Sequence, residues 1–308
     1  MRSFITSFVC CFLSLGYVGM LGGRAHLSSL QQKMFSEYRL PEKYLQAFPF
    51  DQYRVCSAAE QGSFYVETDE DYIKAFLFDG DPWEGEYIEL LKKYVKPRTI
   101  ALDIGAHIGT HTVTLSKAVG EHGLVIAFEP QRKIHRELCM NMQLNGCTNV
   151  IPLLLALGDT NTEVVMPPPP DGNEGGRAII EGYSANAAGS EEICVRRLDD
   201  FKLKNVSFIK MDVEGYEDRA LEGARKTIEM FHPVIFIEIQ GDPGGDEFVR
   251  EGWIEENWEE TEPLKTEHTI QKLESMGYTV SHVYDRDYLA IPSKTKKATS
   301  TGRRVARH

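Results

Sequence analysis

Asp103, Gly105 and Gly109 stand in the segment LDIGAHIGTHT, where an apolar run meets the start of a helical pattern. Glycines at such a turn let the backbone approach a ligand closely, and the helix that follows offers free N–H groups. Glu129 ends the next apolar run, where a carboxylate accepts hydrogen bonds from both hydroxyls of a ribose. Together these residues predict a binding site for a cofactor that contains a nucleoside.

The glycine spacing favours S-adenosylmethionine over a dinucleotide. A dinucleotide fold shows G-x-G-x-x-G, whereas three residues separate Gly105 from Gly109 and Ala106 stands in place of a further glycine. Asp103 suits the cationic amino-acid end of S-adenosylmethionine better than a pyrophosphate, which it would repel. After the third strand, Asp159 is the candidate acceptor for the adenine amino group.

A second group of ionisable residues, Lys210, Asp212 and Glu214, follows a later apolar run, and Glu238 ends the run after that. The carboxyl ends of parallel strands meet at one edge of a sheet, so we expect these side chains to face the cofactor across a crevice. We predict that Asp212 or Glu214 serves as general base or anchors the acceptor. Lys210 would tune that carboxylate by its charge, and Glu238 would orient the acceptor.

Two alternatives to this catalytic assignment stay open. Glu214 and Glu217 are also acids in the first turn of the next expected helix, where acids stabilise the helix N-terminus. Asp212, Glu214 and Glu238 could instead hold a divalent ion, because hard cations take oxygen ligands. Our leading interpretation assigns no metal.

The remaining candidates are histidines and loop aromatics. His107 and His111 lie in the cofactor turn and the helix after it, where we expect them to pack or hydrogen-bond rather than act as bases. Tyr183, Trp253 and Trp258 stand in loops, where an aromatic ring either stacks on a sugar or packs within the loop.

The elements that must position these residues follow from periodicity. From residue 99 onward apolar runs alternate with helical patterns, which is typical of a parallel sheet with helices on both faces. The expected strands span residues 63–66, 72–77, 99–103, 124–129, 150–155, 207–211, 234–239, 279–283 and 288–291. The expected helices span residues 84–94, 110–119, 131–145, 217–230 and 266–276. Two loops, 167–190 and 241–263, interrupt the pattern on the side where ligands bind.

Several segments together resemble the FkbM family of S-adenosylmethionine-dependent methyltransferases. They are LDIGAHIGTHT, AFEP at 127–130, LNG at 144–146, RLDDF at 197–201, FIKMDVEGYE at 208–217, DPWEGEY around Trp83 and Glu84, and the closing GYTVSHVYDRDYLAIP. The resemblance implies the α/β class I methyltransferase fold, with a mostly parallel seven-stranded sheet, and places Glu84 in the cofactor site. It also implies O-methylation of a sugar or another hydroxyl-bearing acceptor. His107 departs from the family, which usually has Asn at that place.

Charge and composition limit the partners. The chain has 308 residues, of which 42% are hydrophobic, and a net charge of −12, which argues against general nucleic-acid binding. Its six cysteines show no spacing typical of a structural zinc site, so we infer no metal cluster from them. We expect a carbohydrate or hydroxyl-bearing small molecule as acceptor.

The two ends of the chain differ from the rest. Residues 4–22 carry no charge and are long enough to cross a membrane, so residues 1–25 read as a signal peptide or signal anchor. We expect a stem over 26–61, the methyltransferase-like domain over 62–292 and a basic, disordered tail over 293–308. The leader favours the secretory pathway or a membrane, with a cytoplasmic location as the alternative.

The leading interpretation of the sequence is an S-adenosylmethionine-dependent O-methyltransferase that acts on a sugar, glycan or related polyhydroxylated acceptor. The alternatives are a methyltransferase of a small-molecule metabolite, a non-catalytic binding module that keeps the cofactor fold, and a dehydrogenase. Fold alone does not separate these functions.

Overall fold

The structure, a computed structural model, describes residues 27–67, 71–170, 172–180, 182–183, 187–240 and 258–293. The expected leader, the basic tail from residue 294 onward and Trp253 lie outside these residues. Among the helices of the described residues, none is long and apolar enough to cross a membrane.

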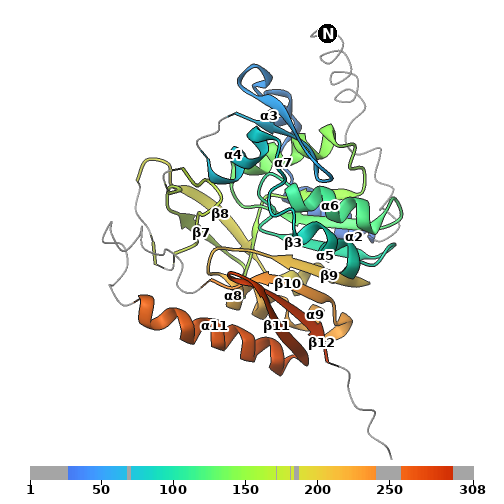
Figure 1. The fold of residues 1–308 in the computed structure, drawn as a ribbon, viewed down its shortest axis with the longest axis vertical. Coiled ribbons are helices and arrows are strands. Elements are labelled where there is room, and N and C mark those ends of the chain that lie inside the picture. The colour runs from blue at the N-terminus through green and yellow to red at the C-terminus, as the bar shows by residue number, and fades with distance from the viewer. Residues whose placement is uncertain are drawn as a thin grey trace, which may run out of the picture.

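A seven-stranded sheet forms the centre of the fold, in the order β11-β12-β10-β9-β3-β4-β5 (Figure 1). Its strands are β3 (Ile100–Ile104), β4 (Leu124–Phe128), β5 (Val150–Leu153), β9 (Val206–Met211), β10 (Val234–Glu238), β11 (Tyr278–Tyr284) and β12 (Asp287–Pro292). Strand β12 is antiparallel to both neighbours, and every pair from β10 to β5 is parallel. The expectation of a mostly parallel sheet is confirmed.

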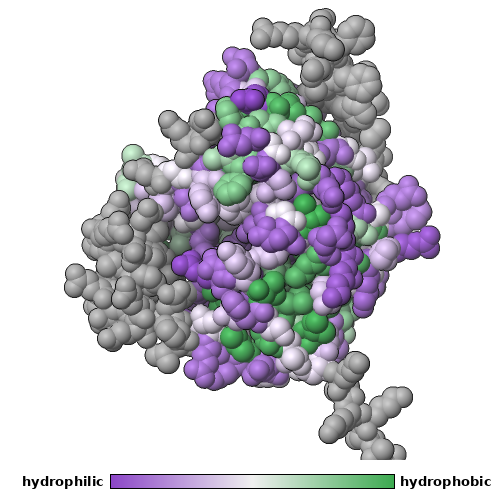
Figure 2. Space-filling model, in the orientation of Figure 1, coloured by the Kyte–Doolittle hydropathy of each residue, from purple (hydrophilic) through white to green (hydrophobic). Residues whose placement is uncertain are grey.

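Alternate residues of the central strands supply two hydrophobic cores, one on each face of the sheet. Leu102 and Ile126 belong to one core, and their neighbours Ala101 and Val125 belong to the other. The core that contains Leu102 and Ile126 is covered by α2 (Ser29–Glu37), α8 (Glu217–Gly223), α9 (Arg225–Phe231) and α11 (Trp258–Ser275). The core that contains Ala101 and Val125 is covered by α5 (Tyr87–Tyr94), α6 (Thr110–Val119) and α7 (Arg132–Leu144). On the face shown in Figure 2, hydrophilic and hydrophobic residues are interspersed.

A smaller sheet of three strands lies between β5 and β9 in the sequence. It consists of β6 (Ala156–Leu157), β7 (Thr162–Met166) and β8 (Glu191–Arg196), in the order β6-β8-β7. The expected loop over 167–190 connects β7 to β8, and its described residues contain neither helix nor strand. The short helix η3 (Leu198–Phe201) then leads toward β9.

The expected strand over residues 72–77 is wrong, because these residues belong to helix α4 (Tyr72–Asp79). The Asp71 side chain caps this helix by accepting a hydrogen bond from Lys74 N at 3.0 Å. Lys74 and Leu77 are both 0% exposed, and residues three apart share one face of a helix. The buried lysine made this face look polar in the sequence, which favoured the strand interpretation.

The expected helix over residues 217–230 is divided in two. Helices α8 and α9 meet at Ala224, which caps the end of the first and the start of the second. Ala224 is 0% exposed and belongs to the same core as Leu221 and Ile228. Both short helices therefore bury one face on the sheet, as the single helix was expected to do.

The expectation of a stem over residues 26–61 is wrong for the described residues 27–61, which fold against the domain. They form α2, α3 (Glu42–Gln46), η2 (Phe50–Gln52) and β1 (Arg54–Ala58), and β1 pairs with β2 (Gly62–Val66). A capping box at Ser28 begins α2. Phe35 is 0% exposed, and its ring centroid lies 5.3 Å from that of Phe201. Polar residues between these anchors hid the short helices in the sequence.

Candidate active site

A cleft of about 690 Å³ opens at the carboxyl ends of the central strands, where ligands bind in open α/β sheets. Its lining includes Gly105 after β3, Glu129 after β4, Asp212 after β9 and Glu238 at the end of β10. A smaller cavity shares Gly105, Glu129 and Asp212 with the cleft and extends toward Leu155 and Tyr216. The strand ends thus bring together the two groups of residues that the sequence singled out.

The turn after β3 forms a cradle that only glycine fits at one position. Gly105 has φ 78°, and a Cβ placed on it would lie 1.7 Å from the backbone oxygen of Asp212. The backbone N–H groups of Gly105 and Ala106 both donate to the carbonyl of Phe128 at 3.0 Å. The turn is therefore fixed between β4 and the Asp212 loop, with its backbone along the cleft.

Gly109 is needed for packing rather than for ligand approach. It has φ 95° at the N-cap of α6, and a Cβ there would lie 2.6 Å from Met142 Cε and 2.7 Å from Leu138 Cδ1. Ala106, at 4% exposed, is buried beneath the turn. Neither Gly109 nor Ala106 lines the cleft or the smaller cavity.

Glu129 lines both cavities and is held by two backbone donors. Its Oε2 accepts from His107 N at 3.0 Å, and its Oε1 accepts from Gln131 N at 2.9 Å. Each carboxylate oxygen retains a lone pair for a ribose hydroxyl. Burial raises the pKa of Glu129 to about 7, against the two backbone hydrogen bonds that lower it. The geometry fits the ribose role assigned from the sequence.

Asp103 lies beneath the turn, at 0% exposed. Its Oδ2 accepts from Thr112 Oγ1 at 2.5 Å, and its Oδ1 has no hydrogen-bond partner among the described residues. Burial raises the pKa of this carboxyl, opposed by the charge of Lys210. Asp103 does not line the cleft, so its contact with the amino-acid end of the cofactor stays a prediction.

Asp159 is not brought to either cavity. Its Oδ2 lies 2.9 Å from Arg219 Nη1 in an ion pair with α8. The preceding residue, Gly158, packs tightly on the same helix, since a Cβ on Gly223 would lie 1.8 Å from the Gly158 carbonyl oxygen. This packing turns the chain away from the cavity, where Leu157 and Tyr216 stand instead.

Lys210 and Asp212 form an ion pair beside the cofactor turn. Lys210 Nζ lies 3.0 Å from Asp212 Oδ2 and 3.3 Å from the carbonyl oxygen of Gly105. Burial would lower the pKa of Lys210, but the charges of Asp212 and Asp103 outweigh it and raise that pKa. Burial would likewise raise the pKa of Asp212, but Lys210 holds it below its ordinary value. Asp212 is therefore ionised at neutral pH.

Glu214 and Glu238 are linked by Gln240, which follows β10. Gln240 Nε2 donates to Glu214 Oε2 at 2.6 Å and to Glu238 Oε1 at 3.2 Å. Burial, with the charge of Asp212, raises the pKa of Glu214 to about 8 and that of Glu238 to about 10. Glu238 is therefore protonated at neutral pH and has a proton to donate in a hydrogen bond.

Glu84 reaches the cleft from the segment before α5, where it adopts φ 48°. Its Oε2 lies 3.3 Å from His111 Nε2 in α6. Burial raises the pKa of Glu84 to about 8 and lowers that of His111 to about 3. His111 is thus neutral and buried, and its Nε2 makes no hydrogen bond within the described residues, in agreement with the packing role expected for it.

Sequence reasoning missed two residues of the site, Tyr87 and Asp287. The hydroxyl of Tyr87 in α5 donates to Asp287 Oδ2 in β12 at 2.5 Å, and both residues line the cleft. Burial raises the pKa of Asp287 to about 6. The signal was present, because Tyr87 ends the DPWEGEY segment and Asp287 lies in the closing GYTVSHVYDRDYLAIP.

Aromatic residues that the sequence did not single out for stacking also line the cleft. Tyr72, Phe76 and Trp83 line it and contact one another edge to face, with ring centroids 5.3 to 5.9 Å apart. Tyr183 lies outside this lining, and its hydroxyl is 3.0 Å from Ser190 Oγ within the loop. The side chain of Trp258 lies outside the described part of the structure.

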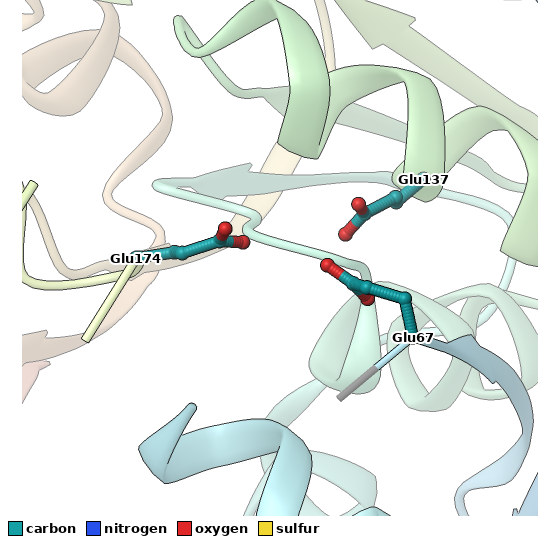
Figure 3. Close-up of side chains that lie close together, drawn as sticks. All are labelled: Glu67, Glu137 and Glu174. Carbon is teal, nitrogen blue, oxygen red and sulfur yellow. The ribbon is translucent and has the colours of Figure 1, made fainter. Parts of the chain in front are cut away.

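The acids of the cleft do not form a tight group of metal ligands. Within the described ranges, the one set of carboxylate oxygens within 4.8 Å of one another belongs to Glu67, Glu137 and Glu174 (Figure 3). Lys74 Nζ lies 2.6, 3.0 and 2.9 Å from these three carboxylates. A lysine ammonium thus supplies the positive charge there, and the divalent site considered for Asp212, Glu214 and Glu238 finds no support in their spacing.

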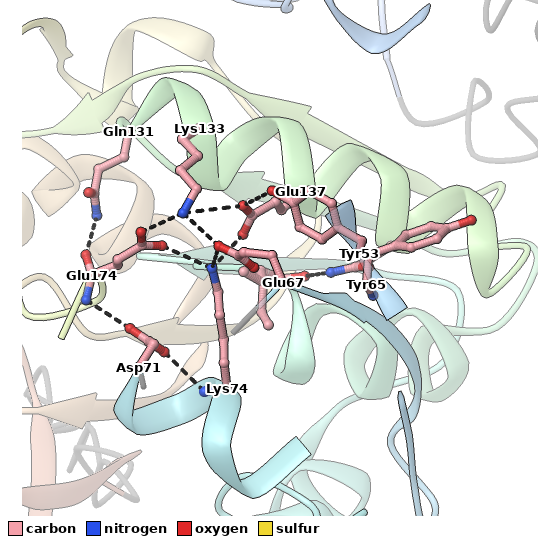
Figure 4. A network of polar contacts seen from close by, with 11 residues as sticks. Tyr53, Tyr65, Glu67, Asp71, Lys74, Gln131, Lys133, Glu137 and Glu174 are labelled. Carbon is pink, nitrogen blue, oxygen red and sulfur yellow. Dashed lines mark hydrogen bonds and ion pairs between the residues drawn. The ribbon is translucent and has the colours of Figure 1, made fainter. Parts of the chain in front are cut away.

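The network around Lys74 fixes the β7–β8 loop against the cleft (Figure 4). Glu174 of this loop contacts Lys74 of α4 and Lys133 of α7. Its backbone N–H donates to Asp71 Oδ2 at 2.9 Å, and its carbonyl accepts from Gln131 Nε2 at 3.1 Å. The next residues of the loop, Gly175 and Gly176, line the cleft. Gly175 and Gly176 therefore form part of the wall of the site, held there by the contacts of Glu174.

Comparison with known proteins identifies the family. The Methyltransferase FkbM domain matches residues 103–280. Among solved structures, an FkbM methyltransferase from Methylobacillus flagellatus KT is 19% identical, with a TM-score of 0.39; the match covers 71% of this chain and 52% of that one, about half its length. Fibrillarin from Aeropyrum pernix, crystallised with natively bound S-adenosyl-L-methionine, is 13% identical, with a TM-score of 0.37 and coverage of 80% and 84%. A comparison with curated proteins finds no match.

The sheet order with its one antiparallel strand, and the glycine turn beside Glu129, are those of the class I methyltransferase fold. Because the domain match covers more than half of the chain, the protein belongs to the FkbM methyltransferase family. The residues present fit the cofactor: Gly105, which has no side chain, lines both the cleft and the smaller cavity, and Glu129 keeps free acceptor positions on both oxygens.

Proposed function

We propose that this methyltransferase transfers its methyl group to a hydroxyl of a sugar, glycan or related polyhydroxylated acceptor. The observation that carries the proposal is the Lys210–Asp212 ion pair, which places an ionised carboxylate beside the cofactor turn and within the cleft. A hydroxyl acceptor must lose its proton during methyl transfer, and a positioned base contributes about 10²- to 10⁴-fold to the rate.

The residues of the cleft divide the work of such a reaction. The bound cofactor supplies a methyl group on a sulfonium sulfur. Asp212 accepts the proton of the acceptor hydroxyl, and Lys210 keeps that carboxylate ionised beforehand. Glu238, which carries a proton, donates a hydrogen bond to a second oxygen of the acceptor and so fixes its orientation. Alignment of the acceptor oxygen with the methyl group is the main source of rate acceleration.

Replacing the proposed base gives the test of this assignment. Asp212→Asn keeps the size of the side chain and removes its charge, so we expect turnover to fall by about 10²- to 10⁴-fold, while S-adenosylmethionine affinity changes little. Turnover is measured with labelled S-adenosylmethionine and a panel of sugars and oligosaccharides, and affinity by calorimetry. Glu121→Gln, at a side chain 84% exposed, is the control. Full turnover in Asp212→Asn would show that another group is the base.

We also propose that residues 4–22 direct the protein to the secretory pathway or a membrane, where it would meet glycans. The support is the uncharged length of this segment. Fractionation of cells that express the chain with a C-terminal tag, followed by N-terminal sequencing, separates a cleaved signal peptide from an anchor. A tagged protein that is wholly cytosolic would overturn the proposal.

A further inference from the structure

The smaller cavity beside Glu129 is the part of the cofactor site that suits the adenine ring. Gly105 and Glu129 line it together with the cleft, and its other walls include Leu155, Leu157 and Tyr216, which do not line the cleft. Mostly apolar walls with a few polar groups are typical of sites for small organic ligands. The cavity is narrow, at about 50 Å³, so the position of its walls decides whether a purine ring enters.

One wall of this cavity is also a wall of the cleft, and residues 175–179 of the β7–β8 loop form it. Gly176 and Ala178 line the cleft, whereas Arg177 and Ile179 line the smaller cavity, and the first residue of the segment lines both. This alternation is that of an extended chain, whose successive residues point to opposite sides. The segment, called the partition below, therefore separates the smaller cavity from the cleft.

Arg177 anchors the partition to the two strands that flank the loop. The side chain is 7% exposed. Its guanidinium donates to the carbonyl oxygens of Met166, at 3.3 Å, and Gly189, at 2.7 Å, and also to that of Pro167. It lies 3.3 Å from Glu191 Oε2. Because Met166 ends β7 and Glu191 begins β8, the arginine ties the partition to both strands.

Glu174 directly precedes the partition and holds its other end (Figure 4). Its carboxylate lies 2.9 Å from Lys74 Nζ and also pairs with Lys133. Its carbonyl oxygen accepts from Gln131 Nε2 at 3.1 Å. The backbone N–H of Gln131 in turn donates to Glu129 Oε1 at 2.9 Å. The contacts of Glu174 therefore connect the partition with the carboxylate assigned to the ribose.

We propose that the partition is the wall of the adenosine half of the cofactor site and that Glu174 is a positioning residue that holds this wall in place. A wall that is fixed before the ligand arrives spares the ligand the entropy cost of ordering it. When the charge of Glu174 is lost, the partition is held less firmly, and binding of the cofactor must restore its position.

Glu174→Gln tests the role of this anchor. The substitution keeps the size of the side chain and both backbone hydrogen bonds, and Lys74 retains Glu67 and Glu137 as partners. We expect the dissociation constant of S-adenosylhomocysteine, measured by calorimetry, to rise about tenfold because the wall is no longer ordered in advance. Methylthioadenosine contains the adenosine and lacks the amino-acid end. Its dissociation constant should rise by the same factor.

Glu67→Gln is the matched control. The Glu67 carboxylate lies 2.6 Å from both Lys74 Nζ and Lys133 Nζ, and its side chain is 16% exposed, against 28% for Glu174. The substitution therefore makes the same charge change in the same network, but at a residue that lines neither the cleft nor the smaller cavity. We expect both variants to lower the free energy of unfolding in urea to a similar extent. Both ligands should bind Glu67→Gln as tightly as the parent protein.

Arg177→Lys tests the second anchor. A lysine keeps the charge beside Glu191 but lacks the planar fork that reaches several carbonyl oxygens at once. We expect weaker binding of S-adenosylhomocysteine and methylthioadenosine, and faster hydrogen exchange of the amides of residues 175–179. In the parent protein, methylthioadenosine should slow the exchange of these amides.

The outcomes decide the inference without any methyl acceptor. A larger loss of affinity for both ligands in Glu174→Gln than in Glu67→Gln supports it. Parent affinity in Glu174→Gln, equal losses in the two variants, or a loss for S-adenosylhomocysteine alone overturns it. Unchanged hydrogen exchange of residues 175–179 on binding of methylthioadenosine to the parent protein also overturns it, because the adenosine would then bind elsewhere.

Discussion

At the scale of single residues, the sequence predicted best the location of those site residues that directly follow a buried strand. Gly105, Glu129 and Asp212 each follow a buried apolar run, so the sequence itself puts them at one edge of the sheet. Asp159 also follows a strand, but packing of Gly158 on α8 turns it toward Arg219. That contact depends on tertiary packing, which no local pattern in the sequence encodes.

Substitution of Gly105 tests the cradle at the cofactor turn. In Gly105→Ala the new Cβ would lie 1.7 Å from the Asp212 backbone oxygen, so the turn or the Asp212 loop must shift. We expect S-adenosylmethionine affinity, measured by calorimetry, to fall at least tenfold. Gly146→Ala is the matched control, because Gly146 has φ 65° with nothing within 4 Å of its Cβ position. Equal losses in both variants would mean that backbone conformation alone explains the effect.

At the scale of elements, the alternation of strands and helices was predictable from periodicity, whereas α2 and α4 were not. Helix α4 buries Lys74 where a core helix normally buries an apolar residue. Its partners are Glu67, which directly follows β2, Glu137 of α7 and Glu174 of the β7–β8 loop. The charge of the buried lysine is balanced by carboxylates from three other segments, which come together only in the folded protein. The local sequence pattern therefore favoured a strand.

Loss of Lys74 should destabilise the fold. Lys74→Met keeps the length of the side chain and leaves Glu137, also 0% exposed, without its closest cation. Removal of one partner from a buried ion pair costs about 3–5 kcal/mol, which urea unfolding measures. Lys92→Met, at a side chain 45% exposed, should change the unfolding free energy by less than about 1 kcal/mol. Similar values for the two variants would contradict the account of the network.

Truncation within α2 tests whether residues 27–61 belong to the folded domain. Phe35→Ala removes a side chain that is 0% exposed, and loss of a buried phenylalanine costs about 3–5 kcal/mol. Tyr44→Ala in α3, at 40% exposed, should cost far less. Urea unfolding followed by circular dichroism measures both. Unchanged stability in Phe35→Ala would restore the interpretation of these residues as a stem.

At the scale of the whole molecule, the net charge of −12 is unevenly placed. Eight acids of the described residues gather along one cleft, namely Glu84, Glu86, Glu129, Asp212, Glu214, Glu238, Asp285 and Asp287. Composition argued against general nucleic-acid binding but did not show where in the fold the acids would gather. The sheet edge concentrates the acids, and Asp287 reaches Tyr87 across the fold, a contact that sequence spacing did not reveal.

This concentration of acids predicts a pH dependence of stability. The pKa values of Glu84 and Glu214 rise from 4.5 to about 8 on folding, so between these values the folded state binds protons that the unfolded state releases. Stability of the cofactor-free protein is therefore lost as pH rises toward and through 8, by up to about 1.4 kcal/mol per pH unit for each group. We expect a lower melting temperature at pH 9 than at pH 6.

The double variant Glu84→Gln with Glu214→Gln should flatten this pH profile, because a glutamine does not titrate. Thermal unfolding across the same pH range measures the slope. Glu121→Gln changes an exposed side chain outside the cleft, so it should leave the pH dependence of the melting temperature unchanged. A double variant with the parent slope would show that these two carboxyls do not cause the dependence.

The chemistry of the product tests the central claim most directly. The protein is incubated with S-adenosylmethionine labelled in its methyl carbon and with neutral and amino-bearing sugars, and the product is analysed by mass and nuclear magnetic resonance. The account predicts one added methyl group bonded to a sugar oxygen, formed in the parent protein and lost in Asp212→Asn. A methyl group bonded only to nitrogen or carbon, or no transfer while the cofactor is bound, would contradict it.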